Sequence, residues 1–201
     1  MKSGIRLLAS TLAAAAGILF ATQAGAGILG TKHDFSAASY GSTQICIFCH
    51  APHNAQTIPE APLWNHQSTG ATYTLYSGPG TMNATKGQPG AVSKLCMSCH
   101  DGTVAIGNFG TITTDTHYVT GKSLMGTDLS NDHPIGFIYD AALVALDSGL
   151  VSPATVVTAG LPLFSSKMEC STCHGVHDDV NKPFLRKTNA ASALCLTCHI
   201  K

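Results

Sequence analysis

The sequence repeats one five-residue pattern, Cys-x-x-Cys-His, four times in 201 residues. The copies begin at Cys46, Cys96, Cys170 and Cys195, and together they contain all eight cysteines of the chain. Two thiols at this spacing can add to the two vinyl groups of one porphyrin, and the histidine beside the second thiol can then reach the iron. Each copy therefore predicts one covalently attached c-type haem, and the chain predicts four.

The predicted attachment residues are Cys46 and Cys49, Cys96 and Cys99, Cys170 and Cys173, and Cys195 and Cys198. The predicted proximal iron ligands are His50, His100, His174 and His199. Two four-thiolate zinc sites, or a redox-active disulfide, would also use paired cysteines. Neither explains why a histidine follows every pair. Chance would place all four histidines there with a probability on the order of one in 10^5. The pattern therefore favours haem over zinc or a disulfide.

The first 26 residues have the pattern of a signal peptide. Lys2 and Arg6 precede an apolar run over 7–21, and small residues at 24–26 are typical of a cleavage site. An apolar run of about 15 residues is shorter than the roughly 20 that span a bilayer, so we expect cleavage rather than an anchor. The predicted organisation is a signal peptide at 1–26 and a single tetrahaem cytochrome c domain at 27–201, without a membrane span. We expect the protein to be exported, to the periplasm or to the cell surface.

Net charge limits the partners that the chain can bind, and chain length limits how large a core its side chains can form. Without Lys2 and Arg6, nine basic and eleven acidic side chains remain, a net charge of −2, and nothing in this balance favours nucleic acid as a partner. Four haems in the remaining chain leave about 44 residues for each, so we expect the porphyrins to form much of the core. The predicted fold class is a multihaem cytochrome c, mostly irregular loop with a few short helices and a haem-packed core.

The motifs form two paired units, at 46–100 and 170–199. Between and within them the sequence predicts few regular elements. Asp140 should cap a helix over 141–147, and a short helix should follow Pro89-Gly90 across the second motif. Asn189 could cap a helix over 192–198, and 73–76 could form a short strand.

Six histidines lie outside the motifs, and a second imidazole on each iron would make an electron carrier rather than a substrate-binding haem. His53 and His177 follow motif histidines by three residues, too close to return to the same iron, so each should bind a neighbouring haem. His133 is oriented by the following proline, and His66 follows a tryptophan in a polar loop. The candidate distal ligands are His53, His66, His133, His177 and His33, whereas His117 has the surroundings of a surface histidine. Methionine ligation is less favoured, because histidines already exceed the irons.

Five candidates for four irons suggest that one histidine serves another chain. His33 is the favoured one, because it lies on an N-terminal arm with little to fold against. A histidine donated across a junction between unlike surfaces would propagate an open filament.

Together these segments resemble the extracellular tetrahaem cytochromes of metal-reducing bacteria that polymerise into conductive filaments, of the OmcE type. The resemblance is carried by 31–36, 49–55, 62–66, 99–102, 128–136 and 194–199, which span nearly all of the mature chain. It implies bis-histidine haems in a continuous stack, a loop-rich fold and head-to-tail assembly into a homo-oligomer. The implied partners are other redox proteins that donate or accept electrons.

The leading hypothesis is electron transfer, without catalysis, through four bis-histidine c-type haems. A soluble periplasmic shuttle would carry the same haems as a filament subunit. A multihaem reductase is the alternative from another class, and it would require one open, five-coordinate haem.

Overall fold

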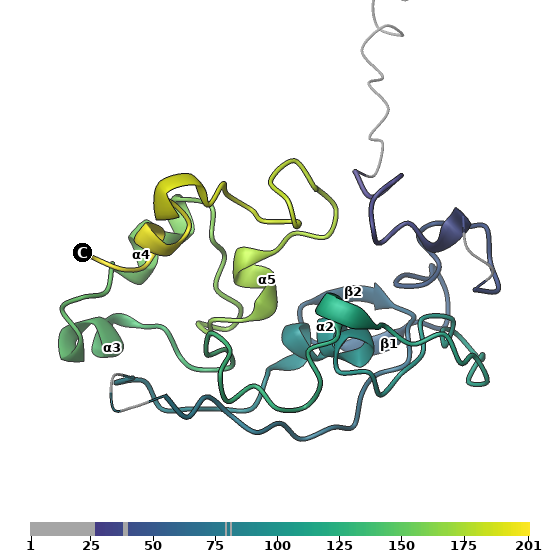
Figure 1. The fold of residues 1–201 in the computed structure, drawn as a ribbon, viewed down its shortest axis with the longest axis horizontal. Coiled ribbons are helices and arrows are strands. Elements are labelled where there is room, and N and C mark those ends of the chain that lie inside the picture. The colour runs from purple at the N-terminus through teal and green to yellow at the C-terminus, as the bar shows by residue number, and fades with distance from the viewer. Residues whose placement is uncertain (1–26, 38–39, 79, 81) are drawn as a thin grey trace, which may run out of the picture.

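The computed structural model describes residues 27–37, 40–78, 80 and 82–201, so the predicted signal peptide at 1–26 lies outside the described residues. Short helices and one small sheet are joined by long loops, and α5 lies between a lobe with the sheet and a lobe with the C-terminus (Figure 1). The described α-helices are α2 (Ala91–His100), α3 (Ala141–Leu146), α4 (Pro153–Thr158) and α5 (Cys170–Cys173). The antiparallel strands are β1 (Gln56–Ile58) and β2 (Ala61–Trp64). The 3-10 turns are η1 (Phe35–Ala37), η2 (Gly121–Ser123), η3 (Ala190–Ser192) and η4 (Cys195–Thr197).

Local signals at the helix starts explain most of these elements. The Asp140 carboxylate accepts a hydrogen bond from the Leu143 N–H at 2.9 Å, which confirms the predicted cap of α3. The predicted helix across the second motif is also confirmed as α2. The sequence analysis missed α4, where Ser152 is the N-cap and Pro153 occupies the first turn, a position that tolerates proline.

Two local predictions were wrong. The Asn189 side chain does not cap a helix, because the segment kinks at Ala191, with φ at 51°, and forms only η3 and η4. Its side-chain oxygen accepts instead from the Cys195 thiol at 3.6 Å. Residues 73–76 do not form a strand: one isolated bridge joins Thr74 to Asp128, and the sheet lies at β1 and β2.

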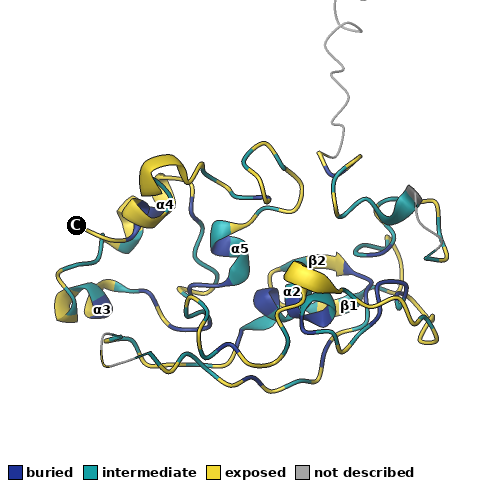
Figure 2. Ribbon diagram, in the orientation of Figure 1, coloured by how far each residue is buried: buried dark blue, intermediate teal, exposed yellow. Residues whose placement is uncertain are grey.

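Side chains form two small hydrophobic clusters, and buried positions are scattered along the loops rather than gathered in one layer (Figure 2). The larger cluster contains Tyr139, Val156, Leu161 and Met168 beneath α3 and α4. The smaller one contains Tyr73, Met97 and Leu129 against α2. Met97 and Met168 are thus packing residues. No helix among the described residues has the length and apolar character needed to cross a membrane.

A buried carboxylate joins α2 to α5. Glu169 caps α5 through a reciprocal capping box with Thr172, and its oxygens accept from the Gly90 N–H, at 3.1 Å, and from the Ser93 hydroxyl. The Ser93 hydroxyl in turn accepts from the Cys170 N–H at 2.9 Å. One carboxylate therefore satisfies donors at the start of both α2 and α5, where the helix dipoles favour negative charge.

We expect Glu169→Gln to lower the free energy of unfolding by about 1–3 kcal/mol, because a neutral amide replaces the charged acceptor of several buried donors. Denaturant unfolding of the haem-loaded protein measures this. Glu60 is the other glutamate of the chain, and its exposed side chain accepts from Ser165. Glu60→Gln is the matched control and should change the free energy by less than about 0.5 kcal/mol. Equal effects of the two substitutions would contradict the joining role of Glu169.

Candidate haem-binding sites

The four motifs lie on different local structures. The second motif occupies the last five residues of α2, and the third occupies α5 and its C-cap, His174. The fourth begins at η4, whereas the first lies in a turn that leads towards β1. In the first, third and fourth motifs, the backbone N–H of the histidine donates a hydrogen bond to the carbonyl of the first cysteine; the bond from His50 to Cys46 is 2.8 Å. In the second motif, α2 continues through the histidine. This folding gathers both thiols and the imidazole at one place.

Three motif histidines are oriented by a hydrogen bond to a backbone carbonyl. His50 Nδ1 lies 2.8 Å from the Pro62 oxygen, His100 Nδ1 2.7 Å from the Ser123 oxygen, and His174 Nδ1 3.0 Å from the Pro183 oxygen. A carbonyl can only accept, so Nδ1 carries the proton and the Nε2 lone pair of the neutral ring remains for a metal. This is the usual arrangement of histidine ligands.

The first and third motifs share one further feature. A later segment of the chain, 62–64 or 183–185 and here called the strap, runs antiparallel to the motif. After the first motif, Ala51 donates to the Leu63 oxygen at 3.0 Å. After the third, Gly175 donates to the Phe184 oxygen at 2.8 Å. Leu63 and Phe184 each follow the proline whose carbonyl holds the histidine, and each has φ at 54°. The two halves of the chain thus repeat one local structure, although the straps lie at different distances along the sequence.

Three of the motif histidines lie beside a second imidazole. The ring centroids are 6.1 Å apart for His50 and His177, 6.0 Å for His100 and His33, and 6.4 Å for His199 and His133. Imidazole nitrogens lie about 2 Å from a metal, so two rings on opposite faces of one iron have centroids about 6 Å apart. The described histidines therefore fit a haem iron at three places.

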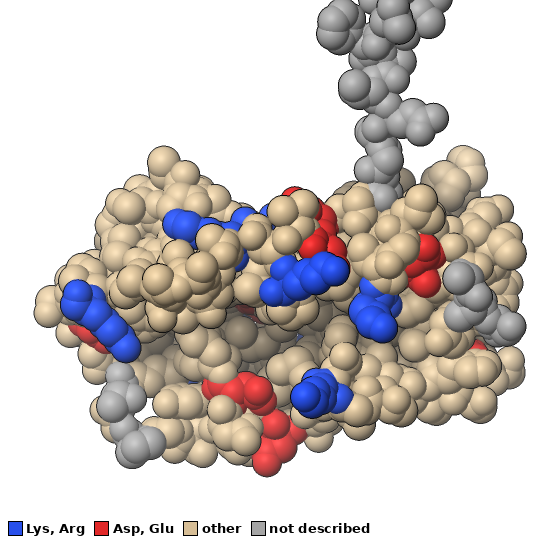
Figure 3. Space-filling view, turned by 45° about the horizontal axis from the view of Figure 1, so that its top comes forward, with Lys and Arg blue, Asp and Glu red and all other residues tan. Residues whose placement is uncertain are grey.

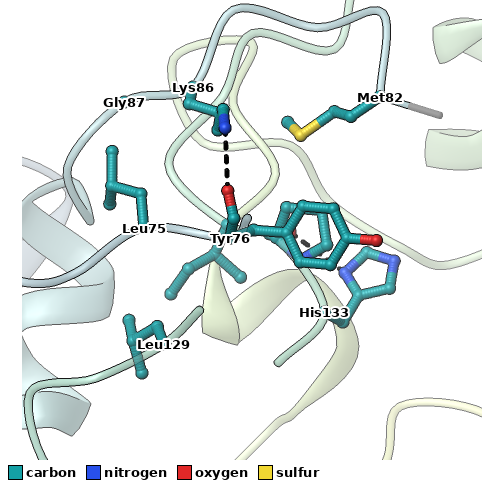
Figure 4. Close-up of a pocket in the computed structure, with 9 residues that line it drawn as sticks. Leu75, Tyr76, Met82, Lys86, Gly87, Leu129 and His133 are labelled. Atoms are coloured by element: carbon teal, nitrogen blue, oxygen red, sulfur yellow. Dashed lines mark hydrogen bonds between the residues drawn. The ribbon is translucent and has the colours of Figure 1, made fainter. Parts of the chain in front are cut away.

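The pKa values of His33 and His133 are lowered, which favours the neutral form that binds metals. Burial, and then the neighbouring His100, lower the pKa of His33 to about 4. Burial also lowers the pKa of His133, whose Nδ1 lies 3.0 Å from the Pro134 oxygen. The His133 ring lies beside Tyr76 in a small pocket that also contains Met82 (Figure 4). Both imidazoles can therefore offer a lone pair at neutral pH.

The position of His33 differs from the sequence-based expectation. Its arm does not extend away from the chain: Gly27 bridges to Asp178, Ile28 is buried, and the His33 ring lies 4.6 Å from that of Phe184. The reason is apolar packing, which the short polar arm did not suggest. His33 thus lies beside His100 of its own chain, rather than free to reach another.

His66, His53 and His117 are placed differently from the paired histidines. His66 is buried with Nδ1 2.8 Å from the Gln67 oxygen and Nε2 3.1 Å from the Ala105 oxygen and 3.6 Å from the Cys99 thiol, and its role as a ligand stays a prediction. His53 is exposed, and no described imidazole lies beside it or beside His174 in the way seen for the three pairs. His117 is exposed and paired with Asp115 at 2.5 Å, as a surface histidine would be.

Thiols of successive motifs lie close together. Burial, and then nearby Cys49, raise the pKa of Cys99 to about 12. The neighbouring Cys170 thiol, and then burial, raise the pKa of Cys96, and burial, followed by Cys170 and Cys195, raises the pKa of Cys173. The first motif is therefore next to the second, the second next to the third, and the third next to the fourth.

The geometry does not fit the zinc or disulfide alternatives. All eight cysteines are unpaired, and among the described residues no three His, Cys, Asp or Glu side chains come together as a metal-binding group. Burial raises the pKa of Cys49 to about 11, and likewise that of Cys198. Reactive redox pairs usually contain a thiol with a lowered pKa, which these buried thiols do not have.

Comparison with known families agrees with this geometry. Residues 164–201 match the doubled CXXCH motif family, a region that contains the third and fourth motifs. No curated protein matches the chain. The family match indicates a multihaem c-type cytochrome, in which the CXXCH motifs bind haem covalently.

We expect His177→Met to raise the reduction potential of one haem, because thioether ligation favours ferrous iron relative to imidazole. A spectroelectrochemical titration of the purified protein measures the change. His117→Met is the matched control, since His117 contacts Asp115 rather than a motif histidine. Potentials and spectra that stay unchanged in the His177 variant would exclude this residue as a ligand.

Proposed function

We propose that the protein carries electrons through four covalent c-type haems, each with histidine on both faces of its iron, as a subunit of an extracellular cytochrome filament. The observation that supports this most directly is the set of three imidazole pairs, with centroids 6.0, 6.1 and 6.4 Å apart. An iron with two imidazoles has no open position for substrate and changes only its oxidation state. A carrier therefore fits these sites better than a reductase does.

The order of the motifs supports transfer along the chain. Each of the first three motifs has a thiol near a thiol of the next motif. The attached haems would therefore follow the order of the motifs along the chain. The haem supplies the electron-carrying iron when bound, and the protein's residues hold and orient it. The hydrogen bonds of Glu169 and its partner Ser93 hold α2, which carries the second motif, against α5, which carries the third.

The surface suits contact with other proteins more than binding to a highly charged polymer. Basic and acidic side chains are few and intermixed on a largely uncharged face, which is hollowed near its centre (Figure 3). The proposed partners are further copies of this chain and other redox proteins, and the proposed location is outside the cytoplasm. A soluble periplasmic shuttle remains the alternative for the same haems.

We expect the intact mass of the purified mature chain to exceed the polypeptide mass by four porphyrins, one for each cysteine pair. Mass spectrometry after denaturation and acid extraction measures this, because thioether bonds survive a treatment that removes non-covalent haem. A mass without four added porphyrins would contradict the proposed cofactor content.

We assign His53 to the iron bound by His174, since both side chains are exposed and neither belongs to the three pairs. His53→Ala should therefore convert one haem of four to the high-spin form, as measured by optical and magnetic spectra, while His117→Ala should not. Unchanged low-spin spectra would overturn the assignment.

Electron micrographs and sedimentation of the same variant test assembly. If His53 is donated across a junction, filaments of the wild type become monomers in His53→Ala, whereas ligation within one chain leaves the filaments intact. A wild type that is monomeric at every concentration would contradict the filament and favour the periplasmic shuttle.

A further inference from the structure

Trp64 is the single tryptophan of the chain, and it stands opposite the first motif histidine. It is the last residue of β2 and forms a bridge with His50. Its ring lies at 89° to the His50 ring, with centroids 6.2 Å apart. The indole therefore borders the site where the first haem attaches.

The indole nitrogen of Trp64 is a buried donor without a partner. The residue is 9% exposed, and its Nε1 makes no hydrogen bond with the described part of the chain. Tryptophan can only donate, and leaving such a buried donor unpaired costs about 1–3 kcal/mol. Native proteins pair nearly all buried polar groups, so this nitrogen indicates an acceptor from outside the polypeptide.

Acceptors in the surrounding backbone are already in use. The Pro62 oxygen accepts from the His50 ring, and the Leu63 oxygen accepts from Ala51. On the other side, the Cys49 oxygen accepts from the Asn65 N–H at 2.9 Å. These three neighbouring carbonyls are therefore already engaged in other hydrogen bonds.

We propose that the indole N–H of Trp64 donates a hydrogen bond to a haem propionate, an inference that rests on the haem binding proposed above. The porphyrin nitrogens hold the iron, so the two propionate carboxylates are the acceptors that a haem offers. A carboxylate accepts strongly from a buried N–H, and the bond favours its ionised form. Trp64 would then fix one porphyrin edge and keep a negative charge beside the iron.

The single tryptophan gives one indole N–H resonance, so nuclear magnetic resonance of the reduced, diamagnetic protein tests the contact directly. We expect a nuclear Overhauser effect between the indole proton and propionate methylene protons. We also expect exchange with deuterated water at least about 100-fold slower than in free indole. The propionate can belong to the haem on Cys46 and Cys49 or to its neighbour, and the methylene assignments distinguish these two.

A tetrahaem protein whose indole proton exchanges at the free rate, or contacts no propionate methylene, would overturn this inference alone. A chain without porphyrin in its mass would overturn the proposed function as well. The two failures are therefore distinguishable.

A variant gives an independent measurement. Trp64→Phe keeps an aromatic ring but loses the N–H, so one propionate should protonate at a higher pH. The potential of one haem should then begin to change with pH at least about one unit higher than in the wild type. Tyr118→Phe, at an exposed residue, is the control and should leave the curve unchanged. A curve for Trp64→Phe that superposes on the wild type would contradict the hydrogen bond.

Discussion

The hydrogen bond from a motif histidine to a backbone carbonyl is the interaction on which the sites depend. It occurs at His50, His100 and His174, with carbonyls of Pro62, Ser123 and Pro183. Each bond joins a short motif to a distant loop, sets the tautomer of the ring and directs Nε2 away from the backbone. In a chain with little regular structure, these bonds connect local folding to the geometry of the metal ligands.

Sequence reasoning succeeded where the chemistry is local. Asp140 marked the start of α3, and the family match at 164–201 agrees with covalent haem at paired motifs, while the individual attachment residues stay predictions. It failed for contacts set by tertiary packing: His33 packs against Phe184, and Glu169 joins two helices from positions 79 residues apart. Sequence reasoning also missed the straps at Pro62 and Pro183. The proline that follows each of these motifs was the signal that could have indicated them.

Residues outside the motifs hold the four motifs in their order along the chain. Glu169 holds α2 against α5, so the second and third motifs cannot move independently without exposing a charged, hydrogen-bonded carboxylate. His177 and His33 each lie beside a motif histidine that is distant in sequence. If both bind iron, each haem ties two segments together, and cofactor loading and folding are coupled.

Low-temperature electron paramagnetic resonance of the oxidised, haem-loaded protein, quantified against total iron, tests the central claim most directly. Two imidazoles on every iron should give low-spin ferric signals that account for all four irons of each chain. A high-spin ferric signal equal to one iron in each chain would contradict the electron-carrier proposal and support a reductase with an open haem.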